Sequence, residues 1–126
     1  MACGTICLSE TTIKKIENNQ IPKGDVLNAA RIAGILAAKK TSQIIPLCHP
    51  LNLTYVEISF TIKKESIEIT AISDAYEKTG VEMEALTAVS ISALTIYDMC
   101  KMLDKKIVIN NIYLKEKTGG KSDVKI

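Results

Sequence analysis

Alternation of hydrophobic and polar residues is clearest over residues 56–62, where Val, Ile, Phe and Ile are separated by Glu, Ser and Thr. The alternation resumes at Ile67 and Ile69, after a polar stretch at residues 64–66. A period of two puts one set of side chains on a buried face, as in a half-exposed β-strand. The two runs therefore predict a β-hairpin.

Other segments have helical spacing instead. Ser9 is placed to cap a helix over residues 10–19, and Asp25 is placed to cap a second helix that ends near residues 39–40. A long apolar stretch after Gly80 predicts a third helix.

Short strands at residues 4–8 and 107–114 complete the pattern. The order is strand, helices, strand, strand, helix, strand. It predicts an α+β fold of the ferredoxin-like βαββαβ type, a two-layer sandwich in which helices cover one face of an antiparallel sheet. With 126 residues, 47% of them hydrophobic, the chain suits one modest core. We therefore expect a single domain over residues 1–126.

Composition excludes several classes of protein. A formal net charge of +2, without a long basic block, argues against nonspecific nucleic-acid binding. The longest apolar run is shorter than a bilayer span, so no membrane segment is expected. The four cysteines lack Cys-x-x-Cys spacing and the N-terminus does not read as a signal peptide, so we expect a cytoplasmic protein.

Residues 79–101 carry carboxylates at both ends of what should be one buried helix. Buried ionised groups are costly unless they are paired or used, so this segment points to a site. At about 1.5 Å per residue, Glu84 and Asp98 should lie roughly 20 Å apart, too far for one small substrate. A second copy of the helix, antiparallel across a two-fold axis, would bring the two ends together. A site shared between subunits is the resulting hypothesis.

Each group also has a simpler interpretation. Asp98 and Lys101 share a helical face and can form a capping salt bridge with no further role. Glu82 and Glu84 point in different directions on a helix, which makes Glu84 the better candidate for a pocket unless Glu82 is still in extended chain.

His49 lies between Pro46 and Pro50, in a loop that the prolines should stiffen. As the only histidine it fits either a structural imidazole or a general acid–base. No second histidine exists to share a zinc ion, so no metal site is expected. Cys48 and Cys100 have apolar neighbours, which favours small buried hydrophobes over nucleophiles.

Lysines beside glycines occur at Lys23-Gly24 and in the tail at residues 117–122, where amides and ammonium groups can reach a phosphate. The alternative is a solvated loop and a frayed terminus. Gly-Gly-Lys-Ser is not a P-loop, because Lys115 occupies the position of the first glycine and no helix follows. Several lysines, one histidine and two or three acids describe a site for proton transfers on a phosphorylated substrate.

Six motifs together resemble molybdenum cofactor biosynthesis protein C, the cyclic pyranopterin monophosphate synthase family, from about Gly4 to Ser122. They are Lys-Gly-Asp-Val at 23–26, Ala-Arg-Ile-Ala-Gly-Ile at 30–35, Ala-Ala-Lys-Lys-Thr at 37–41, Ile-Pro-Leu-Cys-His-Pro-Leu at 45–51, Lys-Thr-Gly-Val-Glu-Met-Glu-Ala-Leu-Thr-Ala at 78–88, and Leu-Thr-Ile-Tyr-Asp-Met-Cys-Lys at 94–101. The resemblance implies that 3',8-cyclo-7,8-dihydro-GTP, made by an upstream radical SAM enzyme, is converted to cyclic pyranopterin monophosphate with release of pyrophosphate. It also implies a homohexamer, a trimer of dimers with pockets at the dimer interface.

The resemblance carries roles to particular positions. It implies a catalytic set of Lys23, Asp98, Lys101 and Lys117, with Asp98 as acid–base. It implies substrate contacts from His49, Glu82 and Glu84, to which we add Cys48 and Met83 as pocket lining and Lys121 as a phosphate contact. No cofactor is expected, and magnesium with the triphosphate is left open.

The chain departs from the family pattern at both ends. The resemblance implies a segment upstream of Gly4 with a basic residue that reaches a neighbouring pocket, so we expect the chain to be N-terminally short relative to the family. The glycine that usually follows Ser122 is replaced by Asp123. The alternatives are a non-catalytic ferredoxin-like module that binds a nucleotide or phosphate, and a purely structural oligomer.

Overall fold

The computed structural model describes residues 1–76, 81–117 and 124–125. Four strands form one antiparallel sheet in the order β2-β3-β1-β4, and two short strands form a separate pair. The elements are β1 (Ala2–Cys7), α1 (Glu10–Glu17), α2 (Val26–Lys39), α3 (Thr41–Ile44), β2 (Leu53–Ile62), β3 (Ser66–Ala75), α4 (Glu82–Cys100), β4 (Val108–Leu114), β5 (Glu116–Lys117) and β6 (Val124–Lys125).

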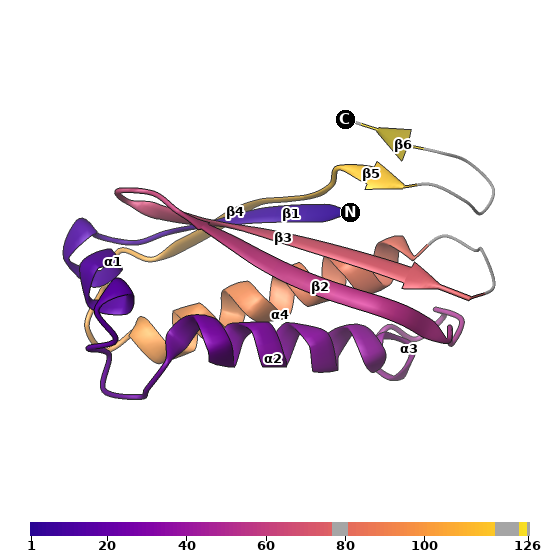
Figure 1. The fold of residues 1–126 in the computed structure, drawn as a ribbon, viewed down its shortest axis with the longest axis horizontal. Coiled ribbons are helices and arrows are strands. Elements are labelled where there is room, and N and C mark those ends of the chain that lie inside the picture. The colour runs from indigo at the N-terminus through magenta and orange to yellow at the C-terminus, as the bar shows by residue number, and fades with distance from the viewer. Residues whose placement is uncertain (77–80, 118–123, 126) are drawn as a thin grey trace.

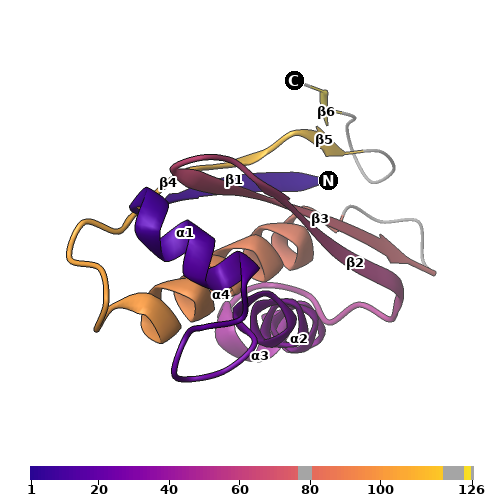
Figure 2. The same cartoon turned by 60° about the vertical axis from the view of Figure 1, so that its left-hand side comes forward.

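Helices α2 and α4 pack side by side on one face of the sheet, with α2 against β2 and α4 against β1, β3 and β4 (Figure 1). The short helix α1 follows β1 at the end of the molecule where α4 finishes (Figure 2). Strand order and layering confirm the predicted ferredoxin-like α+β sandwich, with α1 and α3 added to the basic pattern. No helix in the described ranges is long and apolar enough to cross a membrane.

The predicted helix starts are confirmed at the level of hydrogen bonds. The Ser9 hydroxyl accepts a bond from the Thr12 N–H at 3.3 Å, and the Asp25 carboxylate accepts one from the Asn28 N–H at 3.2 Å. Each cap satisfies a backbone donor that the helix itself leaves without an acceptor. These bonds fix where α1 and α2 begin.

Helices α2 and α4 approach closely because α2 carries a glycine at the crossing. The Ser92 hydroxyl of α4 donates to the Ala30 carbonyl of α2 at 2.8 Å. A Cβ atom at Gly34 would meet Ser92 Oγ and the Ile58 side chain (β2), and would lie 3.0 Å from the Ala88 carbonyl oxygen. Only a residue without a Cβ allows the two backbones this separation.

The expectation that α4 is buried all round is wrong. Its inner face is buried, but Leu94, Tyr97 and Asp98 are exposed, the Asp98 side chain to 58%. In a two-layer fold the sheet and α2 cover only one side of the helix, so its outer side faces solvent in the single chain.

Two further elements were not predicted, α3 and the β5–β6 pair. Two-residue strands are too short for alternation to reveal. The Met1 carbonyl accepts bonds from the Lys115 and Glu116 N–H groups at 2.9 and 3.1 Å. The start of the first strand therefore holds the segment that leads into β5.

Candidate functional site

A three-residue charged cluster, Lys23–Asp98–Lys101, lies at the C-terminal end of α4. Lys101 Nζ is 3.1 Å from Asp98 Oδ1, and Lys23 Nζ is 3.3 Å from Asp98 Oδ2. Lys23 also donates to the Asp98 backbone carbonyl at 3.1 Å. The structure thus brings together three of the four predicted catalytic residues and confirms the Asp98–Lys101 pair.

Hydrogen bonds and charge set the protonation state of this cluster. Hydrogen bonds from Lys101 and then Lys23, reinforced by their charges, hold the pKa of Asp98 below its usual range. Asp98 is therefore a carboxylate at neutral pH, with an ammonium group on each side. All three side chains are about half exposed, so a ligand can reach them.

The loop between α1 and α2 delivers Lys23 to this position. The Gly24 N–H donates to the Ile21 carbonyl at 3.0 Å, which closes a tight turn. Gly24 has a φ of +118°, a conformation that other residues rarely adopt. The turn explains why Lys23 is followed by glycine.

A second group of candidates lies at the N-terminal end of α4. Cys48 Sγ is 4.0 Å from Glu84 Oε2, and Glu84 is only 3% exposed. Burial raises the pKa of Glu84; a backbone hydrogen bond lowers it and the charge of Glu82 raises it further. Glu82 is therefore close enough for its charge to affect the pKa of Glu84, although helical geometry directs the two side chains differently.

Cys48 is half-buried, so the expectation of a small buried hydrophobe is wrong for it and correct for Cys100. Burial raises the pKa of the Cys48 thiol, and Glu84 and Glu82 raise it further. A thiol beside two acids is a poor nucleophile at neutral pH. His49, next along the irregular loop after α3, is exposed, and Met83 in the first turn of α4 is half-buried.

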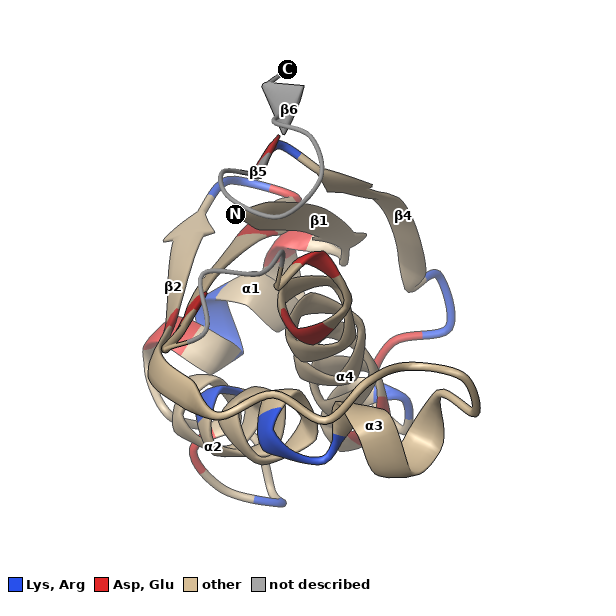
Figure 3. Cartoon of the chain, turned by 90° about the vertical axis from the view of Figure 1, so that its right-hand side faces the viewer, with Lys and Arg blue, Asp and Glu red and all other residues tan. Residues whose placement is uncertain are grey.

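In an end-on view, the acidic first turn of α4 faces the viewer and lies above the loop that follows α3 (Figure 3). The cluster at Asp98 is at the far end of the same helix. At about 1.5 Å per residue the two ends are separated by roughly 21 Å. The single chain therefore leaves the candidates in two groups, as the helix length predicted.

The structure describes the backbone of Lys117, one of the two predicted site lysines near the C-terminus. Lys117 lies in β5, next to the segment bonded to Met1, and β5 sits at the end of the molecule from which α4 begins (Figure 1). The side chain of Lys117 and the whole of Lys121 lie outside the described residues.

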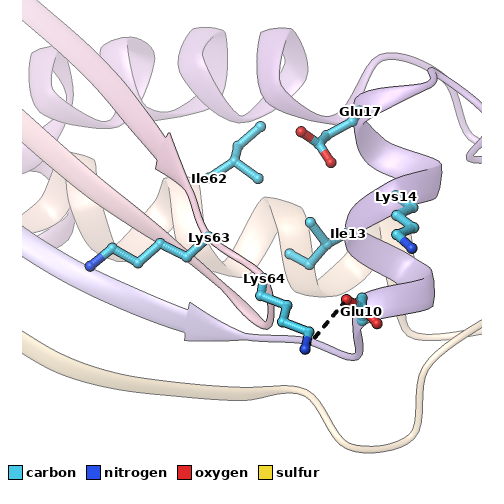
Figure 4. Close-up of a pocket in the computed structure, with 7 residues that line it drawn as sticks. All are labelled: Glu10, Ile13, Lys14, Glu17, Ile62, Lys63 and Lys64. Carbon is cyan, nitrogen blue, oxygen red and sulfur yellow. Dashed lines mark ion pairs between the residues drawn. The ribbon is translucent and has the colours of Figure 1, made fainter.

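A shallow cavity of about 190 Å³ lies between α1 and the β2–β3 turn and shares no lining residue with either group (Figure 4). Lysine and glutamate alternate around it, and Lys64 Nζ lies 4.0 Å from Glu10 Oε2. Exposed, balanced charges of this kind are typical of a solvated surface. Its lining residues are Glu10, Ile13, Lys14, Glu17, Ile62, Lys63 and Lys64.

One buried acid was missed by the sequence reasoning. Asp104 follows α4 and accepts backbone hydrogen bonds from Ser9 and Lys106. Its neighbours Lys105 and Lys106 make the segment look like a polar surface turn, so no sequence signal marked it. Within the described ranges, no three His, Cys, Asp or Glu side chains are grouped as metal ligands would be.

Fold and site together define a ferredoxin-like α+β protein with acids at both ends of one long helix and lysines beside the acid at its C-terminal end. A model of the MoaC family matches residues 1–120, and the chain belongs to the MoaC family. Its relatives include the cyclic pyranopterin monophosphate synthases of Heliobacterium modesticaldum, 55% identical, and Clostridium perfringens, 57% identical. Each alignment covers 97% of this chain and 78% of the relative.

A longer relative places the family in its biosynthetic context. The molybdenum cofactor biosynthesis bifunctional protein of Chlorobaculum tepidum is 56% identical over 96% of this chain, which corresponds to 39% of that protein. The names of these relatives agree with the family that the sequence motifs resemble.

Proposed function

We propose that this protein is a cyclic pyranopterin monophosphate synthase of molybdenum cofactor biosynthesis. The substrate is 3',8-cyclo-7,8-dihydro-GTP, and the reaction releases pyrophosphate. Family membership and relatives more than half identical over nearly the whole chain support the activity. The structural observation that carries the proposal is the ionised Asp98 held between Lys23 and Lys101.

The cluster suits the chemistry of this reaction. Asp98 is an unprotonated base at neutral pH, and the adjacent ammonium groups can bind phosphate oxygens or pass a proton. The raised pKa of Glu84 suits a group that holds a proton at the other end of the helix. We assign substrate contacts to Glu84, Glu82, Met83, Cys48 and His49, and phosphate contacts to Lys117 and Lys121.

A complete site needs both ends of α4, so we propose that it forms between two subunits. A partner helix running antiparallel places its Glu84 end beside the Asp98 cluster of the first chain. Leu94 and Tyr97 on the exposed side of α4 provide apolar surface for such contacts. The assembly we propose is a homohexamer, a trimer of dimers.

Incubation of the purified protein with the cyclised dihydro-GTP substrate tests the activity directly. We expect cyclic pyranopterin and pyrophosphate from the wild type, and none from Asp98→Asn or Lys117→Ala with the oligomer intact. Glu68→Gln is the control, because Glu68 is a partly exposed carboxylate paired with Lys63 on the sheet. Unaltered turnover in Asp98→Asn or Lys117→Ala would remove that residue from the mechanism.

The same experiment separates the enzyme from the alternative, a non-catalytic module that binds a nucleotide or phosphate. Binding of the substrate without product would favour the module. The reaction requires an upstream enzyme that cyclises GTP, and we assign that role to a radical SAM enzyme. The four cysteines are free thiols, which supports a reducing cytoplasmic location. We expect turnover without a resident metal, checked by exhaustive chelation.

A further inference from the structure

Asp104 is a buried carboxylate outside both groups of candidates, and only 7% of the residue is exposed. Its Oδ2 accepts the Ser9 N–H at 2.8 Å and its Oδ1 accepts the Lys106 N–H at 3.0 Å. None of the ion pairs in the described part of the chain includes Asp104. A buried carboxylate satisfied by backbone donors is fixed in place by the fold.

The protonation state of Asp104 preserves both bonds. Burial raises its pKa, but hydrogen bonds from the N–H groups of Ser9 and Lys106 and from the hydroxyls of Thr12 and Ser9 together outweigh burial and hold the pKa below its usual range. The group is therefore ionised at neutral pH, and each oxygen remains an acceptor.

Asp104 sits where the two segments that carry the charged cluster are joined. On one side, the N–H groups of Leu103 and Asp104 donate to the Cys100 carbonyl at 2.9 and 3.1 Å, which holds Asp104 one turn beyond Lys101. On the other side, Ser9 caps α1, and the loop that follows α1 carries Lys23. Asp104 therefore links the two segments, through its backbone to the end of α4 and through its carboxylate to the start of α1.

We propose that Asp104 is a positioning residue for the Lys23–Asp98–Lys101 cluster, an inference that rests on the function proposed above. The hydrogen bonds of its carboxylate go to Ser9 and Lys106 and not to Lys23, Asp98 or Lys101. It fixes the start of α1 against the end of α4, so the loop carrying Lys23 and the helix end carrying Asp98 approach at a constant separation. A shift of either segment breaks the 3.3 Å contact between Lys23 and Asp98.

Asp104→Asn keeps the shape of the side chain but turns one acceptor into a donor that faces a backbone N–H. We expect kcat to fall about 10- to 100-fold, because small misplacements of reacting groups have effects of this size. KM should change less than about twofold. Ile67→Val in the core is the control for stability, with its melting temperature lowered but its kcat unchanged. An Asp104→Asn enzyme with the kcat of this control would overturn the proposal.

A double-mutant cycle distinguishes positioning from general destabilisation. In a Lys23→Met background the cluster is already incomplete, so Asp104→Asn should lower kcat by less than about a further twofold. Full additivity of the two losses would contradict an action through the cluster.

A backbone variant tests the same contact without changing Asp104. Ser9 has a φ of −65°, which proline adopts, so Ser9→Pro keeps the backbone conformation but removes the hydroxyl and replaces the N–H that Asp104 accepts with the ring Cδ, which pushes the carboxylate away. Ser9→Ala is the matched control because it loses the hydroxyl cap but keeps the N–H to Asp104. We expect Ser9→Pro to lower kcat at least about fivefold more than Ser9→Ala. Equal kcat values would contradict the proposal.

The pKa of Asp98 gives a readout that does not require turnover. Carbon-13 NMR of labelled aspartate should show the Asp98 pKa rising in Asp104→Asn, because Lys23 moves away while Lys101, three residues along the same helix end, still donates to Asp98. An unchanged Asp98 pKa would refute the positioning role. If the wild type proves inactive on the substrate while Asp98 still responds to Asp104→Asn, the proposed function fails and the positioning role stands.

Discussion

Lys23 Nζ lies 3.3 Å from the Asp98 carboxylate and 3.1 Å from the Asp98 backbone carbonyl, although the two residues are 75 positions apart in the chain. The carbonyl belongs to the last turn of α4, where the helix leaves it without an intrahelical partner. Lys23 therefore has two roles: it caps the C-terminal end of α4 and it pairs with the Asp98 carboxylate.

Replacing either member of this pair should separate activity from stability. Asp98→Asn should lower kcat by about 10²- to 10⁴-fold, the usual contribution of a positioned acid–base group. Its melting temperature should hardly change, because exposed ion pairs contribute little to stability. Steady-state kinetics and thermal unfolding of the same preparation check both parts. A melting temperature lowered in proportion to the lost activity would assign Asp98 a structural role instead.

Mixing two inactive variants tests whether the site is shared. In a dimer with one Glu84→Gln chain and one Asp98→Asn chain, one pocket holds both substitutions and the other holds none. Random reassociation should then restore about a quarter of the wild-type sites. Activity of a mixture refolded together, compared with the same variants refolded apart, measures this. If the mixture remains inactive, Glu84 and Asp98 do not act across an interface.

Glu84 should make the protein less stable at neutral pH than an uncharged residue would. Its folded pKa is raised above the unfolded value of about 4.3, mainly by burial. Its stabilising contribution is therefore complete below the unfolded pKa and is lost as the pH rises through the folded pKa. Glu84→Gln should unfold at higher denaturant concentration than wild type at pH 7, and at a similar concentration near pH 3.

The surface variant Glu68→Gln is the control for this titration, because Glu68 is partly exposed and paired with Lys63. It should not reproduce the pH-dependent gain. If Glu84→Gln is less stable than wild type at pH 7, contacts of the Glu84 carboxylate stabilise the fold by more free energy than burial of its charge costs.

Gly34→Ala should destabilise the contact between α2 and α4. The added Cβ would fall within hard contact of Ser92 Oγ and 3.0 Å from the Ala88 carbonyl, so the helices must separate. Overpacking of this kind costs about 1–3 kcal/mol in the free energy of unfolding. Combining Gly34→Ala with Ser92→Ala should cost less than the sum of the two, since the clashing oxygen is gone. Strict additivity in urea unfolding would show that Ser92 is not the obstacle.

Local chemistry made much of the fold predictable. Ser9 and Asp25 mark helix starts because capping depends on residues three positions away. The hairpin is visible because its two strands alternate and are adjacent in sequence. The position of Asp98 on one long helix also follows from sequence alone.

The surroundings of the site residues were harder to predict from the sequence. Nothing near Asp98 in the sequence indicates that Lys23 pairs with it, because the contact depends on how α1 docks against the end of α4. The exposure of Asp98 was misjudged for a related reason: the composition of α4 does not show which side the sheet leaves open. Glu84, which helical spacing favoured over Glu82, is buried on the same side of α4 as Ala85 and Ala88.

Because Met1 bonds the segment that leads into β5, the two parts of the proposed site should form at different times during folding. The helix ends that carry Glu84 and Asp98 form from residues close together in the chain, and such local contacts form early. Lys117 takes its place in β5 only when β1 has paired with β4 and Met1 has bonded Lys115 and Glu116, which requires closing a loop of nearly the whole chain. A refolding protein should therefore regain its helical signal before it regains turnover.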